Sequence, residues 1–92
     1  MIKSFACRDT ENLFNDERVP RFQAFERQAR KRLMVLHAAP SLEALTLNPG
    51  NRFHALRGDR KGQYAISINR QWRVCFEWHE GNAYNVEITD YH

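Results

Sequence analysis

The sequence predicts an α+β fold, in which a mainly antiparallel twisted sheet carries helices on one face. Apolar residues recur at helical spacing before residue 48, whereas after residue 50 they alternate with polar residues as in strands. The tripeptide Asn48-Pro49-Gly50 separates the two patterns. Because 92 residues can bury one core but not two, we expect a single domain over residues 1–92.

A strand and a short helix are expected at the beginning of the chain. Residues 2–7 are predicted to form the strand, with several apolar side chains available for packing. Asp9 or Thr10 can cap the helix that follows, because a short polar side chain satisfies a free N–H group at a helix start. We expect this helix to extend to about Phe14.

The main helix is predicted to begin near Pro20, because the first helical turn tolerates proline, and to end before Pro40. Ser41 can cap a further short turn. The apolar stripe of the main helix has spacings of three and four residues and consists of Phe22, Phe25, Ala29, Leu33 and Leu36. Its basic face is open to two interpretations, a solvated surface or a contact with RNA or protein: Arg27, Arg30, Lys31 and Arg32.

Three strands of an antiparallel meander are predicted in the second half, linked by short turns at residues 69–71 and 80–82. The residues expected on the apolar face are Tyr64, Ile66, Ile68, Trp72, Val74, Phe76, Trp78, Tyr84, Val86 and Ile88. Helices must cover this face, so the two tryptophans are expected in the core, with base stacking as the alternative. The other face is mixed, and it holds Arg73.

No membrane segment is expected, because no apolar run approaches the roughly 20 residues that a bilayer requires. The N-terminal residues are interrupted by charges, unlike a signal peptide. We therefore expect a cytoplasmic protein, in which Cys7 and Cys75 are reduced, buried and inert.

Positive charge is concentrated between Asn51 and Arg73. This stretch has a net charge of +5, whereas the whole chain has only +3, so a polyanion is the expected partner. Its basic residues are Arg52, Arg57, Arg60, Lys61, Arg70 and Arg73, and it also contains His54. The turn residues Arg60 and Lys61 are open to a merely solvated role.

The chain ends in Asp90-Tyr91-His92, three side chains that can transfer protons. Histidines and cysteines show no metal-ligand spacing, and neither a nucleophile elbow nor a glycine-rich phosphate loop is present, so no metal or cofactor is predicted. RNA carries its own nucleophile, the 2′-hydroxyl, and its cleavage needs only a base, an acid and cations. We therefore expect metal-independent RNA cleavage, with the terminal triplet and Arg73 bordering one pocket.

Four segments resemble the HigB toxins of the RelE/ParE superfamily: Met1-Ile2-Lys3-Ser4-Phe5, Leu56-Arg57-Gly58-Asp59-Arg60, Ile68-Asn69-Arg70-Gln71-Trp72-Arg73-Val74-Cys75-Phe76 and Asp90-Tyr91-His92. The resemblance covers essentially the whole chain. It implies a small RelE-like fold and a bacterial type II toxin that cleaves translated mRNA in the ribosomal A site. It also implies a HigA-type helix-turn-helix antitoxin that neutralises the toxin, the complex of the two binding operator DNA.

Residue by residue, Arg73 and Asp90-Tyr91-His92 match the active-site set of the family, and His54 and Arg57 match positions used in some members. Where some relatives have a basic residue near the hairpin, this chain has Asn69, with Arg70 adjacent as a possible substitute.

The roles that the resemblance implies remain open between alternatives. Arg73 and Arg57 would stabilise the scissile phosphate, and Asp90 or His54 would accept or orient the 2′-proton. His92 or Tyr91 would protonate the leaving oxygen, unless Tyr91 stacks on a base.

Residues expected to bind RNA or the ribosome lie in the basic stretch and on the main helix: Arg52, Arg60, Lys61, Arg70, Arg27, Arg30 and Lys31. Two other functions are compatible with the sequence. A ParE-like toxin would share the fold and inhibit DNA gyrase, and a small basic RNA-binding domain would bind RNA without cutting it.

Overall fold

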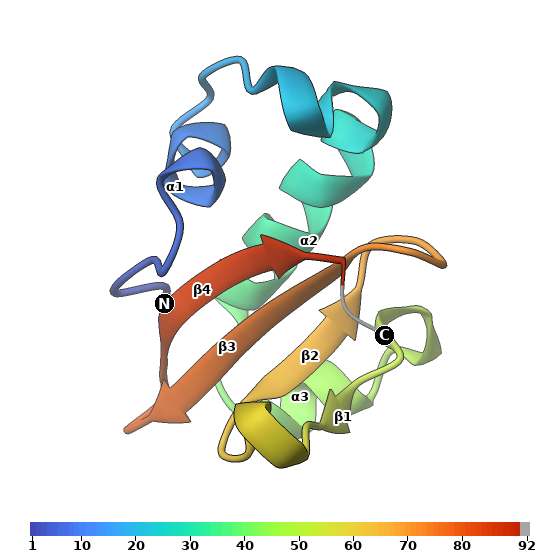
Figure 1. The fold of residues 1–92 in the computed structure, drawn as a ribbon. Coiled ribbons are helices and arrows are strands. Elements are labelled where there is room, and N and C mark those ends of the chain that lie inside the picture. The colour runs from blue at the N-terminus through green and yellow to red at the C-terminus, as the bar shows by residue number, and fades with distance from the viewer. Residues whose placement is uncertain (91–92) are drawn as a thin grey trace.

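The structure, a computed structural model, describes residues 1–90 and confirms the α+β class (Figure 1). Its elements in chain order are α1 (Arg8–Phe14), η1 (Pro20–Phe25), α2 (Glu26–Ala38), α3 (Leu42–Thr46), η2 (Pro49–Asn51), β1 (His54–Ala55), η3 (Gly58–Arg60), β2 (Tyr64–Ser67), β3 (Arg73–His79) and β4 (Asn82–Thr89). The labels η denote 3₁₀ helices. No helix within the described residues is long and apolar enough to span a lipid bilayer.

The sheet has four antiparallel strands in the order β1-β2-β3-β4. The three predicted strands are confirmed, and β1 is an additional strand. Its two residues are too few to show alternation, which explains why the sequence pattern did not predict it. The β3–β4 connection is a tight hairpin in which Glu80 and Gly81 both have positive φ, as a type I′ turn requires.

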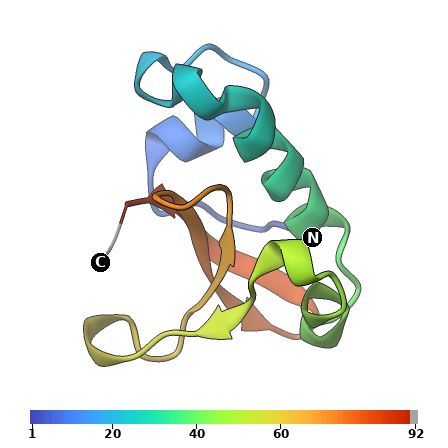
Figure 2. The ribbon, with the colours of Figure 1, turned by 90° about the vertical axis from the view of Figure 1, so that its right-hand side faces the viewer.

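Helices cover one face of the sheet, and the core lies between the two layers (Figure 2). All five predicted stripe residues of the main helix are buried there. Trp72 stacks on Phe25 with ring centroids 4.9 Å apart and meets Phe22 edge-on. Both Trp72 and Trp78, predicted in the core, are half-buried and pack against it. Such aromatic contacts contribute about 0.5–1.5 kcal/mol each beyond the area that they bury.

The N-terminal segment runs along the outer edge of β4, where the structure differs from the predicted strand over residues 2–7. It forms two isolated parallel bridges, Ile2 with Ala83 and Phe5 with Val86. Further along this edge, the Ile88 N–H donates to the buried Thr10 hydroxyl at 2.9 Å. The N-terminal residues thus occupy hydrogen-bonding groups that would otherwise be exposed at the sheet edge.

The starts of the first two helices also differ from expectation. Cys7 is the N-cap of α1 and makes no side-chain cap bond. The predicted caps Asp9 and Thr10 lie inside the helix, where the Thr10 hydroxyl accepts from the Ile88 N–H. The main helix does begin at Pro20, but its first six residues form the 3₁₀ helix η1. The predicted cap at Ser41 is confirmed, since its hydroxyl accepts from the Ala44 N–H at 3.2 Å.

A β-bulge at Asn85 makes one face assignment wrong. Asn85 has φ +53°, and the pairing shifts so that Cys75 faces Glu87 whereas Glu77 faces Tyr84. The extra residue in β4 reverses the alternation before the bulge. Tyr84 therefore shares a face with Glu77 instead of joining the apolar set, and buried Ala83 takes its place in the core.

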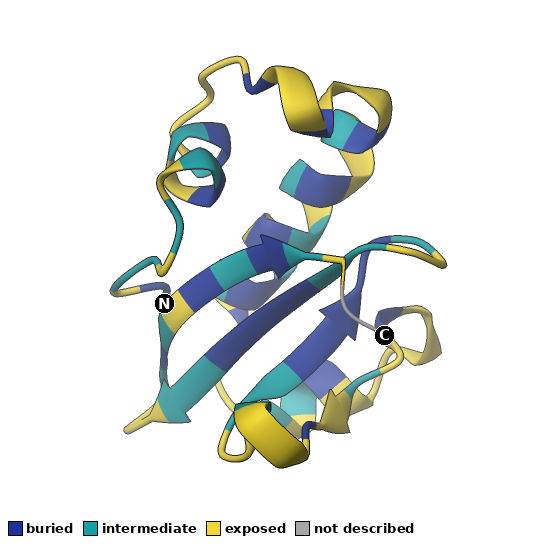
Figure 3. Ribbon diagram, viewed as in Figure 1, coloured by how far each residue is buried: buried dark blue, intermediate teal, exposed yellow. Residues whose placement is uncertain are grey.

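Figure 3 shows burial running along the central strands, whereas β1 and η3 are exposed. Cys75 is buried, but Cys7 is only half-buried, so the predicted burial of both cysteines is wrong for Cys7. Both cysteines are free thiols, as expected for reduced residues.

Candidate active site

The side of the sheet that faces away from the helices carries the candidate active site. Directly paired residues point to the same face, so the register defines two rows across β2, β3 and β4. The residues of this face, called the polar face below, are Ala65, Ser67, Arg73, Cys75, Glu87 and Thr89.

Arg73 lies at the start of β3, and its guanidinium is held by the preceding turn. Its Nη1 lies 2.6 Å from the Asn69 carbonyl oxygen, 3.1 Å from that of Arg70 and 3.2 Å from that of Trp72. The Asn69 side chain shapes this turn by accepting from the N–H groups of Gln71 and Trp72. Within residues 1–90 neither Nε nor Nη2 of Arg73 makes a hydrogen bond.

The structure places Asp90 close to Arg73. Thr89 pairs directly with Arg73, and Asp90 is the next residue. Gln71 Nε2 donates to Asp90 Oδ2 at 2.8 Å, which links the end of β4 to the β2–β3 turn. Tyr91 and His92, the other two residues of the predicted triplet, lie outside the described residues. The structure therefore brings Asp90 to the same end of the sheet as Arg73, and the shared pocket of the triplet and Arg73 stays a prediction.

His54 lies in the same row as Cys75 and Glu87. It pairs with Ala65, which pairs with Cys75, which in turn pairs with Glu87. At the usual strand spacing this row spans about 14 Å from His54 to Glu87. His54 Nδ1 lies 3.2 Å from the Arg52 carbonyl oxygen. The short strand β1 therefore brings His54 to the same face as Arg73.

Cys75 is central to the polar face, with 1% of its surface exposed. Burial raises the pKa of its thiol to about 11, against the opposing influence of the Arg60 guanidinium. The carboxylate of Glu87 also raises this pKa, and the guanidinium of Arg73 lowers it. At neutral pH Cys75 is thus a neutral thiol, and it packs with Ala65 and Leu56 in a second small core.

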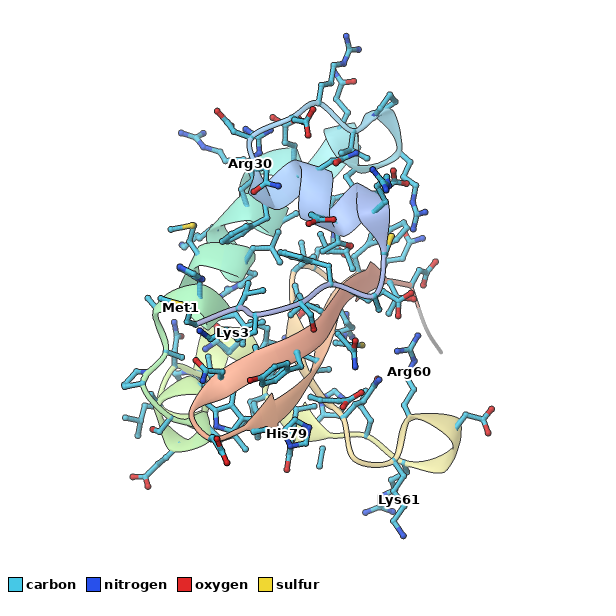
Figure 4. The ribbon with its side chains drawn as sticks, turned by 90° about the vertical axis from the view of Figure 1, so that its left-hand side faces the viewer. Met1, Lys3, Arg30, Arg60, Lys61 and His79 are labelled. Carbon is cyan, nitrogen blue, oxygen red and sulfur yellow. The ribbon has the colours of Figure 1, made fainter. Side chains whose placement is uncertain are left out.

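Arg60 reaches from the η3 loop to β4, where it forms an ion pair with Glu87 at 3.3 Å. Its Nη1 also donates to Gln63 Oε1 at 3.0 Å. In Figure 4, Arg60 points toward the end of β4, whereas Lys61 points away from the sheet. Of these two predicted RNA-binding residues, the structure brings only Arg60 onto the polar face.

The remaining residues of the basic stretch are exposed around this face. Arg57 lies just before η3, and Arg52 follows η2 with a left-handed φ of +46°. Arg52 and Arg70 line one cavity of about 200 Å³ together with Ser67 and Asn69. Because Ser67 pairs with Arg73, this cavity adjoins the Arg73 row.

The basic residues of α2 belong to the helical layer and not to the polar face. Arg27 and Lys31 are exposed. Arg30, by contrast, forms ion pairs with Asp16 at 2.6 Å and with Glu26 at 3.5 Å. Arg30 therefore stabilises the packing of α2 against the loop after α1.

Sequence reasoning missed two side chains at the site, Glu87 and Gln71. Glu87 alternates with apolar residues along β4, but only the register shows that it lies beside Arg73 and opposite Cys75. Gln71 is a turn residue, and its bond to Asp90 depends on the return of the chain 19 residues later. Within residues 1–90 no group of three or more His, Cys, Asp or Glu side chains is arranged to hold a metal ion.

Comparison with known proteins shows similarity over nearly the whole chain. Residues 3–92 match the family of HigB-like toxins, described as RelE-like toxins of the type II toxin–antitoxin system HigB. Toxin HigB-1 of Vibrio cholerae serotype O1 is 33% identical over 90 residues, covering 96% of this chain and 95% of that protein. Endoribonuclease HigB of Proteus vulgaris is 39% identical over 41 residues, which is 45% of each chain.

Solved structures support the fold at low sequence identity. A point mutant of YafQ from E. coli superposes with a TM-score of 0.63 at 10% identity, covering 98% of this chain and 93% of that one. The YoeB–YefM complex from Staphylococcus aureus gives a TM-score of 0.58 at 16% identity, covering 100% of this chain and 98% of that one. These likenesses concern the fold. The family match over residues 3–92, together with the 33% identity to toxin HigB-1, shows that the chain belongs to the HigB-like toxins, the RelE-like toxins of type II toxin–antitoxin systems.

Proposed function

We propose that this chain is a ribosome-dependent mRNA endonuclease, which cleaves translated messages in the ribosomal A site without a metal ion. The observation that carries the proposal is the Arg73 guanidinium, held by three carbonyl oxygens at the end of the sheet where Asp90 leaves β4. A fixed guanidinium suits the oxygens of a phosphate in the transition state. The P. vulgaris relative is named an endoribonuclease.

In this mechanism the 2′-oxygen attacks the phosphorus and the bond to the 5′-oxygen breaks, giving a 2′,3′-cyclic phosphate and a 5′-hydroxyl. Arg73 and Arg57 stabilise the negative charge that develops on the phosphate. Asp90 or His54 accepts the 2′-proton or orients the group that does. His92 or Tyr91 protonates the leaving oxygen, unless Tyr91 instead stacks on a base.

Gln71 supports the role proposed for Asp90. Its amide donates to one carboxylate oxygen at 2.8 Å and so fixes the orientation of the carboxylate near Arg73. A positioned acid or base contributes roughly 10²–10⁴-fold to the rate. The polar face carries few proton carriers, so we expect ribosomal RNA to position the message and cleavage of free RNA to be slow.

We infer that the partner of the toxin is a HigA-type antitoxin with a helix-turn-helix domain. A type II system pairs a toxin with an antitoxin, and the similar YoeB structure is of a YoeB–YefM complex. Operator DNA would be bound only through the toxin–antitoxin complex. The toxin would act in the cytoplasm, where ribosomes translate their messages.

The test is to express the chain and map the 5′ ends of a translated message. Wild type should produce new ends inside codons, whereas Arg73→Ala and removal of the last three residues should reduce them at least 10²-fold. Intact mRNA together with inhibited gyrase would support the ParE-like alternative. RNA that is bound but never cut would support the simple binding domain.

A further inference from the structure

Glu87 is an acidic residue on the face that the proposed function assigns to RNA. It lies opposite Cys75, two residues before Thr89, which pairs with Arg73. Diagonal neighbours on adjacent strands are about 7–8 Å apart, so Glu87 is near any phosphate that Arg73 binds. A carboxylate at this distance would repel that phosphate unless a positively charged side chain neutralised it.

The positively charged group that pairs with Glu87 is the Arg60 guanidinium. Both Nη1 and Nη2 of Arg60 lie 3.3 Å from Glu87 Oε1, and Nη1 also donates to Gln63 Oε1. Arg60 comes from a loop and Glu87 from the last strand, so the arginine side chain reaches toward the end of β4 (Figure 4). Because Glu87 pairs with Cys75 in the middle of the polar face, its ion pair draws the Arg60 guanidinium toward that face.

We propose that Glu87 is a positioning residue that holds Arg60 on the polar face as a second phosphate ligand beside Arg73. This inference rests on the proposed function, because it assigns Arg60 to the RNA of that same site. Arg60, Arg73 and Glu87 together keep a net positive charge. Glu87 thus lowers the total charge of the site but fixes where one of its two guanidinium groups lies.

The geometry of the ion pair fits a positioning role better than a purely stabilising one. Tight charged hydrogen bonds measure about 2.7–2.9 Å, and the strongest arginine–carboxylate pairs use both carboxylate oxygens. Here both bonds measure 3.3 Å and end on one oxygen. The two side chains are 29% and 33% exposed, so a phosphate can approach the guanidinium from solvent.

The test measures RNA affinity, because positioning and simple charge repulsion predict opposite changes in the affinity of Glu87→Gln. The full chain would be titrated with a 2′-O-methyl single-stranded RNA, which binds but lacks the nucleophile, across a range of salt concentrations. Glu87→Gln removes a negative charge, so electrostatic repulsion alone predicts tighter binding. Positioning predicts about 10-fold weaker binding, with the salt slope reduced by about 0.7 as one phosphate contact is lost.

Two further variants complete the binding test. Arg60→Ala should weaken binding as much as Glu87→Gln, and the double variant should be no weaker than Arg60→Ala alone. Glu77→Gln is the matched control, because Glu77 lies on the same side of β3 but bonds to Asn85 and His79. It should shift binding less than 2-fold. Tighter binding by Glu87→Gln, or independent effects in the double variant, would overturn the proposal.

Kinetics on translated message separate positioning from catalysis. Glu87→Gln should raise KM about 10-fold and leave kcat and its pH profile unchanged, since Glu87 acts through Arg60. If Glu87→Gln lost the acidic limb of the pH profile of kcat, Glu87 would be a general base and the positioning role would be wrong. If wild type cuts no message, the proposed function fails, whereas the binding experiment still decides whether Glu87 positions Arg60. Wild type that binds no RNA contradicts both.

Discussion

Thr10 links the first helix to the last strand through a single buried hydrogen bond. Its hydroxyl accepts from the Ile88 N–H at 2.9 Å, and both residues are fully buried. Thr10→Val keeps the shape of the side chain but leaves that N–H without its acceptor. We expect Thr10→Val to lower the free energy of unfolding by about 1–3 kcal/mol, measured by urea denaturation.

Thr10→Ser is the matched control, because serine keeps the hydroxyl and loses only a methyl group. It should be more stable than Thr10→Val. Equal stability of the two variants would mean that packing, and not the hydrogen bond, is what Thr10 contributes.

Cys75 should make the protein less stable in alkali. Its pKa is raised from 9.0 to about 11 by burial, so the folded state keeps the thiol proton when the unfolded chain has lost it. This stabilisation is complete below pH 9 and is lost as the pH rises through about 11. The free energy of unfolding should be lower at pH 10.5 than at pH 8. This difference should be smaller in Cys75→Ala than in wild type by on the order of 2 kcal/mol. An identical decrease in both proteins would contradict this.

At the level of single residues, the sequence indicates which side chains to consider but not which of them meet. Residue types and the family resemblance point to Arg73 and Asp90, and the structure places Arg73 at the start of β3 and Asp90 directly after its partner Thr89 at the end of β4. The Arg60–Glu87 pair was not predictable, because its members are 27 residues apart and meet only through the register of three strands. No local pattern reports a contact of that kind.

Among the elements, β4 depends on a bulge whose backbone only some residues adopt. Asn85 has φ +53°, a left-handed conformation that asparagine and glycine tolerate and that a β-branched residue resists. Asn85→Val should lower the free energy of unfolding by about 1–2 kcal/mol relative to Asn85→Gly, as measured by chemical denaturation.

The glycine variant is the proper reference, because both substitutions remove the bond from Asn85 to Glu77. That bond is the main cause of the lowered pKa of Glu77, so both variants should raise this pKa equally, as seen by NMR titration. If the valine and glycine variants are equally stable, the left-handed backbone at residue 85 does not strain a β-branched side chain.

Elements were predictable where a period is long and unbroken. The stripe of the main helix and the strands β2 and β3 follow their periods throughout, and their apolar residues pack toward the core as predicted. Ala65 and Ser67 on the opposite face of β2 are buried as well, which the alternation does not predict. The alternation predicts the wrong face for Tyr84, because the bulge turns this residue to the other side of the sheet. It also fails for β1, whose two residues are ordered by pairing with β2 and not by their own pattern.

For the whole molecule, two basic surfaces lie on different layers. The polar face holds Arg73 and Arg60, and the helical layer presents Arg27 and Lys31. If the helical surface contacts rRNA, Arg27→Glu with Lys31→Glu should greatly reduce co-sedimentation with ribosomes, because two attractive charges become repulsive. The folding of the variant should be unchanged.

The matched control is Lys3→Glu with Arg8→Glu, which makes the same change of charge at two other exposed positions. Ribosome binding that falls equally in both double variants would reflect net charge alone. In that case the basic face of α2 would be an ordinary solvated surface.

The pairing of the N-terminal segment with β4 makes folding of the domain depend on the last strand of the chain. Ile2 and Phe5 pair with Ala83 and Val86, so these early residues find their partners only after β4 has been synthesised. A nascent chain interrupted before residue 82 lacks both this strand and Asp90, and its core stays open. Chains shortened before residue 82 should therefore fail to form the folded domain.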